Sequence, residues 1–173
     1  MHHPSAAAHV RSLLQPGAAG IVLRDLDLAG AHIEDMDLSG VQMHGCRLTA
    51  ATLARVALRG AQIHLSFLDR ATFASCDATG GNFLNSVFAG CELVDCIFDD
   101  SEIVQCNFLG IRAVRTRFDH SNLYGSRFVG SILEEVSMRD CSLMRTLFDA
   151  GHRAAVDFKS SNPNEAVFLE QSP

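Results

Sequence analysis

The chain has 173 residues and a mass of 18.7 kDa, and its hydrophobic content of 47% excludes an intrinsically disordered protein. The net charge of −6, from 14 Lys and Arg against 20 Asp and Glu, leaves no basic stripe for a phosphate backbone, which disfavours direct nucleic-acid binding. No long apolar run and no signal-peptide pattern is found, so we expect a cytoplasmic protein that does not enter the membrane.

The first twenty residues, 1–20, are expected to form an N-terminal cap. Residues 5–14, SAAAHVRSLL, favour a short helix with Ser5 as its N-cap, and Pro16 and Gly17 would end it. A cap of this kind covers the exposed strand edges at the end of a repeat structure.

Residues 21–150 repeat with a period of five, which fits neither an α-helix nor a β-strand. The 26 positions spaced five apart from Leu23 to Phe148 include 24 residues that are Leu, Ile, Met or Phe. We refer to these positions as centres. Two residues before each centre, 19 of 26 positions hold Ala, Ser, Cys, Gly or Thr, and we refer to these as small inward positions.

The charges and most glycines occupy the other three positions of each pentad. Centres and small inward positions must therefore both point into the core, while the other three positions face solvent. A chain that turns every five residues in this way winds into a narrow tube filled by its own side chains.

The pentads LDLAG, MDLSG, GNFLN, CNFLG and SNLYG resemble the repeats of the pentapeptide-repeat family. The resemblance implies an all-β fold: a right-handed quadrilateral parallel β-helix, a solenoid with four pentads per coil and about six to seven coils. The residue before the centre matches the family's usual Asp or Asn at Asp27, Asp37, Asp77, Asn82, Asn107 and Asn122.

Four pentads per coil would stack residues that are twenty apart, at about the 4.8 Å spacing of neighbouring strands. Phe98 should then lie on Phe118. One side of the tube should hold a longer aromatic column, made of Phe88, Phe108, Phe128 and Phe148.

Residues 151–173 are expected to form a degenerate last coil or a C-terminal tail. Arg153 and Pro163 fall on centres, where neither residue suits a core. Phe158 and Phe168 still keep the phase of the repeat.

All the cysteines fall on small inward positions, where a thiol acts as a small buried hydrophobe. They are Cys46, Cys76, Cys91, Cys96, Cys106 and Cys141. Without a C-x-x-C pair, we expect no zinc or redox site and a reducing compartment. The stacking of His44 on His64 brings two imidazoles together but lacks a third ligand, so we expect no metal and no cofactor.

An enzyme is not expected. The serines at small inward positions, such as Ser66, Ser86 and Ser121, should be buried, so they offer no exposed hydroxyl nucleophile. A convex tube filled with side chains also has no cleft for a substrate.

A strip of outward apolar residues is the strongest candidate for a binding site. It consists of Leu84, Val104, Leu109, Tyr124, Val129 and Met144. Such a strip indicates a protein interface, with Arg127 and Arg145 suited to its rim. The alternative is that the cap or the C-terminal tail folds over it.

The leading hypothesis is therefore a protein-binding scaffold that docks a partner of unknown identity, or a second copy of itself in a homodimer. The rival hypothesis, implied by the family resemblance, is a bacterial DNA mimic that binds a type II topoisomerase (DNA gyrase) and protects it from inhibitors. Mimicry needs one sign of charge along the rod. One outward column instead mixes signs: Asp35, Arg55, Ser75, Asp95, Arg115 and Glu135.

Overall fold

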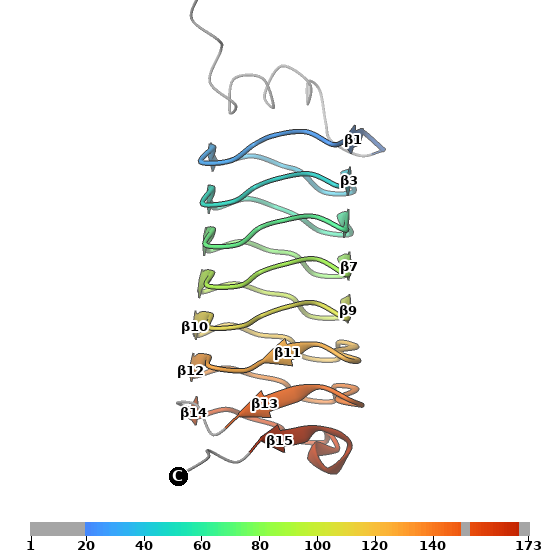
Figure 1. The fold of residues 1–173 in the computed structure, drawn as a ribbon, viewed down its shortest axis with the longest axis vertical. Helices are drawn as coiled ribbons and strands as arrows, with labels where there is room; N and C mark the ends of the chain where they lie inside the picture. Colours follow the sequence, from blue (N-terminus) through green and yellow to red (C-terminus); the bar gives the residue numbers. More distant parts are fainter. Residues whose placement is uncertain (1–19, 150–152, 170–173) are drawn as a thin grey trace, which may run out of the picture.

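The computed structural model describes residues 20–149 and 153–169, which form one solenoid of short parallel strands stacked in about seven coils (Figure 1). Apart from Gly20, the predicted N-terminal cap lies outside the described residues. No helix in the described part of the chain has the length and apolarity needed to cross a membrane.

Two columns of strands lie on opposite sides of the rod (Figure 1). The first side carries β1 (Val22–Arg24), β3 (Gln42–His44), β5 (Gln62–His64), β7 (Asn82–Leu84) and β9 (Glu102–Val104). The third side carries β2 (His32–Glu34), β4 (Thr52–Ala54), β6 (Thr72–Ala74), β8 (Glu92–Val94), β10 (Arg112–Val114), β12 (Ile132–Glu134) and β14 (Arg153–Ala154).

The second and fourth sides connect these columns. The second side is joined by single bridges such as Phe67 to Val87, and near the C-terminus by three paired strands. These are β11 (Arg127–Phe128), β13 (Leu147–Asp149) and β15 (Val167–Leu169). The fourth side has only bridges, such as Asp77 to Ile97, and a 3₁₀ helix, η1 (Pro163–Glu165), precedes β15. Every pairing is parallel and joins residues twenty apart, which confirms the predicted four-pentad coil.

The corners follow the five-residue period without exception in the described chain. Every described residue whose number is a multiple of five, from 20 to 160, has a positive φ. In the turn from Leu28 to Ala31, the Ala31 amide donates to the Leu28 carbonyl (3.0 Å), and Gly30 is the third residue with φ 65°. A positive φ at that place is typical of a type II turn and explains why glycines recur there.

Side-chain amides and carboxylates close many of these turns. Asp27 and Asn107, just before centres, each accept a hydrogen bond from the amide two residues later, at 3.0 Å in both cases. Asn82 is the first residue of β7 and does not follow this pattern. Its Oδ1 instead lies 3.1 Å from His64 Nε2.

The core is the interior of the tube, and all the described centres from residue 23 to 148 are buried there. The predicted aromatic columns are confirmed. Phe98 stacks on Phe118 with ring centroids 5.2 Å apart. The longer column is stacked at 4.7–5.4 Å and extends one coil further than expected: Phe88, Phe108, Phe128, Phe148 and Phe168.

Small inward hydroxyls satisfy carbonyl groups that point into the tube. Ser121 Oγ donates to the Phe98 carbonyl and Ser126 Oγ to the Ile103 carbonyl, both at 2.7 Å. In each case the acceptor is a centre residue 23 positions earlier. No buried side-chain nitrogen or oxygen of the described residues lacks a partner, so Ser and Thr occupy the core without an unsatisfied polar group.

The six cysteines play the same part as these serines. All are buried free thiols, and Cys106 Sγ donates to the Phe83 carbonyl at 2.8 Å. Burial raises the pKa of Cys91 and of Cys106 to about 12. Cys91 and Cys106 therefore stay protonated at neutral pH, and a protonated thiol is neither a nucleophile nor a metal ligand.

Candidate protein-binding surface

Several charges on the third side pair with a neighbour one coil away. Arg55 Nε and Nη2 donate to the Asp35 carboxylate at 2.7 and 2.9 Å. Arg115 makes the same two-pronged contact with Asp95, at 2.6 and 2.8 Å. The arginine hydrogen bond lowers the pKa of Asp95. The mixed column predicted from the sequence therefore contains two ion pairs, which contribute little stability when exposed.

The fourth side is also charge-paired. Arg59 Nε donates to Asp77 at 2.6 Å, and Arg139 Nε donates to Asp157 at 2.6 Å. Arg117 bonds to Asp99, whose pKa is raised because the carboxyl is buried. Neither of these two sides presents a continuous run of negative charge.

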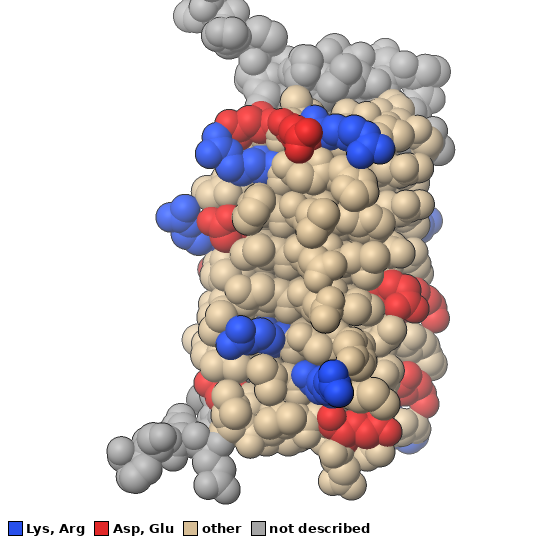
Figure 2. Space-filling model, turned by 45° about the vertical axis from the view of Figure 1, so that its right-hand side comes forward, with Lys and Arg blue, Asp and Glu red and all other residues tan. Residues whose placement is uncertain are grey.

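The first and second sides meet at a corner with a different character. Figure 2 shows this corner, and its middle is a broad surface without charged residues. The predicted first-side residues stack here in register: Leu84 pairs with Val104, the Gln105 amide donates to the Tyr124 carbonyl, and the Gly125 amide donates to the Met144 carbonyl.

The predicted second-side residues form a parallel column. The Gly110 amide donates to the Val129 carbonyl at 2.9 Å, which places Leu109 beside Val129 in successive coils. Leu84, Val104 and Tyr124 are half-buried, as are these two residues, whereas Met144 is 47% exposed. Each column is thus contiguous, and the two lie on adjacent sides of the corner.

Leu65 is the residue that the sequence interpretation missed. It is 56% exposed, and Phe67 in the same coil is 51% exposed. Leu65 occupies the corner itself with φ 51°, a left-handed conformation that costs a non-glycine residue about 1–2 kcal/mol. The available signal was a bulky apolar residue at a multiple of five, where neighbouring corners carry Gly45 and Asn85.

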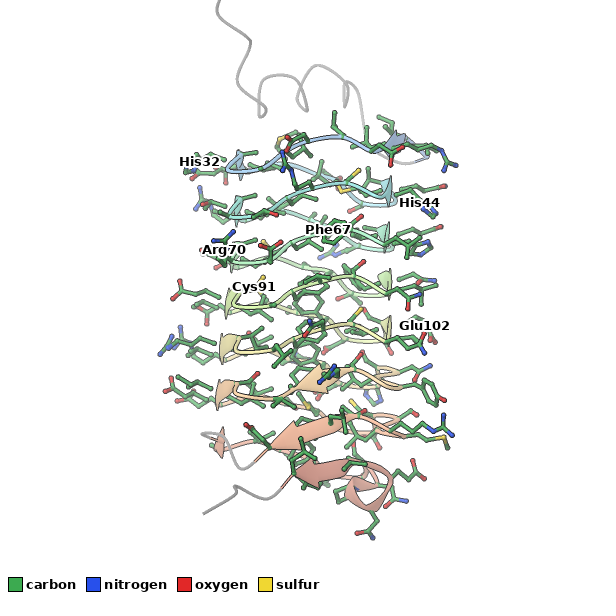
Figure 3. The ribbon with its side chains drawn as sticks, viewed as in Figure 1. His32, His44, Phe67, Arg70, Cys91 and Glu102 are labelled. Atoms are coloured by element: carbon green, nitrogen blue, oxygen red, sulfur yellow. The ribbon has the colours of Figure 1, made fainter. Side chains whose placement is uncertain are left out.

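We define the apolar corner as the residues of both columns together with these exposed side chains. It comprises Leu65, Phe67, Leu84, Val87, Val104, Leu109, Tyr124, Val129 and Met144. Figure 3 shows Phe67 on the second side of the rod, with His44 and Glu102 projecting from the first side.

Two histidines border the apolar corner toward the N-terminus. The His44 and His64 rings meet edge to face with centroids 5.2 Å apart, as their spacing predicted. Within residues 20–149 and 153–169, no three His, Cys, Asp or Glu residues gather closely enough to hold a metal ion. The pair is therefore a polar border of the surface.

The serines at small inward positions are part of the core. Ser66, Ser86 and Ser121 are buried, and each hydroxyl donates to a backbone carbonyl, at 2.9, 2.9 and 2.7 Å. These three hydroxyls therefore satisfy carbonyl groups of the core, which is a packing role.

Comparison with protein families matches the model described as pentapeptide repeats, in eight copies, over residues 20–63 and 68–103. Comparison with curated proteins finds no match. Among solved structures, HetL from the cyanobacterium Nostoc, a pentapeptide repeat protein involved in heterocyst differentiation regulation, is similar in fold. Its sequence identity is 10%, 97% of each chain is covered, and the TM-score is 0.62.

Two further structures share less of the geometry. QnrB1, a plasmid-mediated fluoroquinolone resistance protein, is 16% identical over 82% of this chain and 81% of its own, with a TM-score of 0.47. A pentapeptide repeat protein from the Arabidopsis thaliana thylakoid lumen is 14% identical over 71% and 72%, with a TM-score of 0.48. At these identities the likeness concerns the fold.

Proposed function

Because the chain is a pentapeptide-repeat protein, we propose that it is a non-enzymatic scaffold that binds a protein partner through the apolar corner. Repeat solenoids present long, regular surfaces, and binding surfaces are the usual use of that shape. The family match supports the scaffold, and the surface chemistry supports the choice of corner.

One observation carries this proposal: Leu65 and Phe67, two residues apart in the same coil, each expose more than half of their surface. Full burial of a leucine or phenylalanine side chain is worth about 1.5–3 kcal/mol. Exposed apolar patches rimmed by polar residues mark interaction sites.

Photo-crosslinking in the cell of origin tests the proposal. A photoreactive amino acid replaces Phe67 in one variant. In a second variant it replaces Ala57, which lies on the fourth side. We expect a discrete cross-linked product from Phe67 alone. A product containing two copies of this chain would identify the partner as a second copy.

Charge substitutions provide the matched control. Leu65→Asp should abolish the product, since Asp tolerates the left-handed corner conformation while placing a charge on the surface. Ser75→Asp adds the same charge in the same coil, at a corner with φ 53° on another edge of the rod, and should leave the product unchanged. Equal cross-linking from Phe67 and Ala57, or none from Phe67, would refute the proposal.

The DNA-mimic alternative finds no support in the charge geometry. A mimic of the duplex needs unpaired negative charge along the rod, whereas the carboxylates of Asp35, Asp77 and Asp95 are each engaged by arginine. A gyrase supercoiling assay with the purified chain should accordingly show no inhibition and no protection from inhibitors.

A further inference from the structure

Two arginines, Arg127 and Arg145, lie at the C-terminal end of the apolar corner and form no ion pair with another described residue. Most of the other arginines do. The ion-paired ones are Arg47, Arg55, Arg59, Arg70, Arg112, Arg115, Arg117 and Arg139. Two guanidinium groups without an ion pair to another described residue therefore lie beside the surface proposed for docking.

Arg145 is held in position by the apolar corner itself. Its Nη1 donates to the Tyr124 hydroxyl at 3.1 Å, and its guanidinium carbon lies 5.9 Å from the centroid of the Tyr124 ring. A cation over an aromatic ring gains electrostatic stabilisation. The contact orients the guanidinium group while leaving other N–H groups available for an incoming acceptor.

Arg127 lies on β11 between Asn107 and Leu147 in the adjacent coils, so no carboxylate stands directly beside it in its column. Two carboxylates in the coil that follows these residues, those of Asp149 and Glu165, have other partners. Asp149 Oδ2 accepts from the Gly130 amide at 2.8 Å, and Glu165 Oε1 accepts from Asn162 Nδ2 at 3.0 Å.

We infer that Arg127 and Arg145 bind a carboxylate of the protein partner, so the partner presents an acidic side chain next to an apolar anchor. This inference rests on the proposed function. Arginine suits the role because its planar fork forms charge-assisted hydrogen bonds to carboxylates. Phe67 and Arg127 are three coils apart, about 14 Å at the spacing of stacked strands, which sets the separation between the partner's apolar anchor and its acid.

A second copy of the chain fits these arginines less well. Two parallel rods in contact along this corner would bring Arg127 opposite Arg127. Two antiparallel rods centred on the middle coil, residues 81–100, would bring Arg47 opposite Arg127. The same arrangement would bring one favourable pair together, Asp25 and Arg145. Like charges across an interface are unfavourable, so a different protein with acidic groups is the better occupant.

Selection from a random peptide library displayed on phage, against the immobilised full chain, tests the inference. We expect enriched peptides that combine aromatic or aliphatic residues with Asp or Glu. Binding of a selected peptide is then measured by fluorescence anisotropy. Arg127→Glu with Arg145→Glu should weaken it about tenfold or more, and replacing the peptide's acidic residues by Lys should restore affinity for that variant.

The matched control is Arg24→Glu with Lys159→Glu, which reverses two cations that likewise form no ion pair with another described residue. This double variant should change the affinity less than about twofold. Peptides that lose binding in Leu65→Asp but ignore the charge reversal at Arg127 and Arg145 would overturn this inference and leave the proposed function standing. Peptides insensitive to Leu65→Asp would overturn both.

Discussion

The rings of Phe108 and Phe128 stack face to face in the core, with centroids 4.7 Å apart and planes within 2° of each other. The two residues are twenty positions apart, on the same side of successive coils. Each ring therefore covers the next, and the column continues through Phe148 to Phe168. Aromatic pairs of this kind contribute about 0.5–1.5 kcal/mol beyond the burial of their area.

Truncation within this column should be costly. Phe108→Ala should lower the free energy of unfolding by about 3–5 kcal/mol, because the cavity lies between two rings and cannot collapse. Urea denaturation measures the change. Phe67→Ala, which removes an exposed ring, should change stability by less than about 0.5 kcal/mol. Similar values for the two variants would contradict the stacked column.

Gly81 makes room for an aromatic ring, and adding a methyl group there should destabilise the fold. A Cβ at this position would lie 2.4 Å from Phe83 Cε2 and 2.9 Å from the Ala78 carbonyl oxygen. Gly81→Ala should therefore cost about 1–3 kcal/mol. In the background of Phe83→Leu the same substitution should cost less, since the ring is gone. Additive effects in this double-mutant cycle would show that the ring is not the obstacle.

Leu65→Gly should raise the free energy of unfolding by about 0.5–1 kcal/mol, because glycine adopts the left-handed conformation without a steric penalty. Asn85→Gly is the matched control at the next corner of the same edge, where φ is 52°. Asn tolerates this conformation, so Asn85→Gly should raise the free energy of unfolding by less than Leu65→Gly does. Thermal unfolding of both variants measures the two changes. A loss of stability in Leu65→Gly would contradict the expected steric penalty at Leu65.

Stability should fall at alkaline pH because of the buried thiols. In the unfolded chain a cysteine ionises near its ordinary pKa of 9.0, whereas burial raises the pKa of Cys91 and Cys106 to about 12 and that of Cys141 to about 11. The raised pKa values mean that the contribution of these thiols to stability is complete below pH 9 and is lost as the pH rises toward 12.

The measurement is the urea midpoint between pH 8 and pH 11. Cys91→Ala with Cys106→Ala should show a shallower decline than the unmodified chain, because fewer protons are released on unfolding. If the urea midpoints of the two proteins declined equally with pH, the loss of stability at alkaline pH would be due to other groups.

Much of this architecture was readable in the sequence. A five-residue period with two inward positions per pentad leaves the backbone one geometry, a tube whose centres are buried, and the centres from Leu23 to Phe148 follow it. The number of pentads per coil did not follow from the period. It came from the resemblance carried by pentads such as MDLSG, and it alone decides that Phe88 meets Phe108.

The details of the surface depended on the tertiary structure. The sequence placed Leu84, Val104 and Tyr124 on one outward column, because stacking follows from position alone. The exposure of Leu65 did not follow in this way, since it depends on the corner conformation and on what neighbouring coils cover. The sequence also did not show which carboxylate each arginine pairs with. Arginine side chains of this protein reach carboxylates 18, 20 or 22 residues away, and side-chain rotamers and local packing select among them.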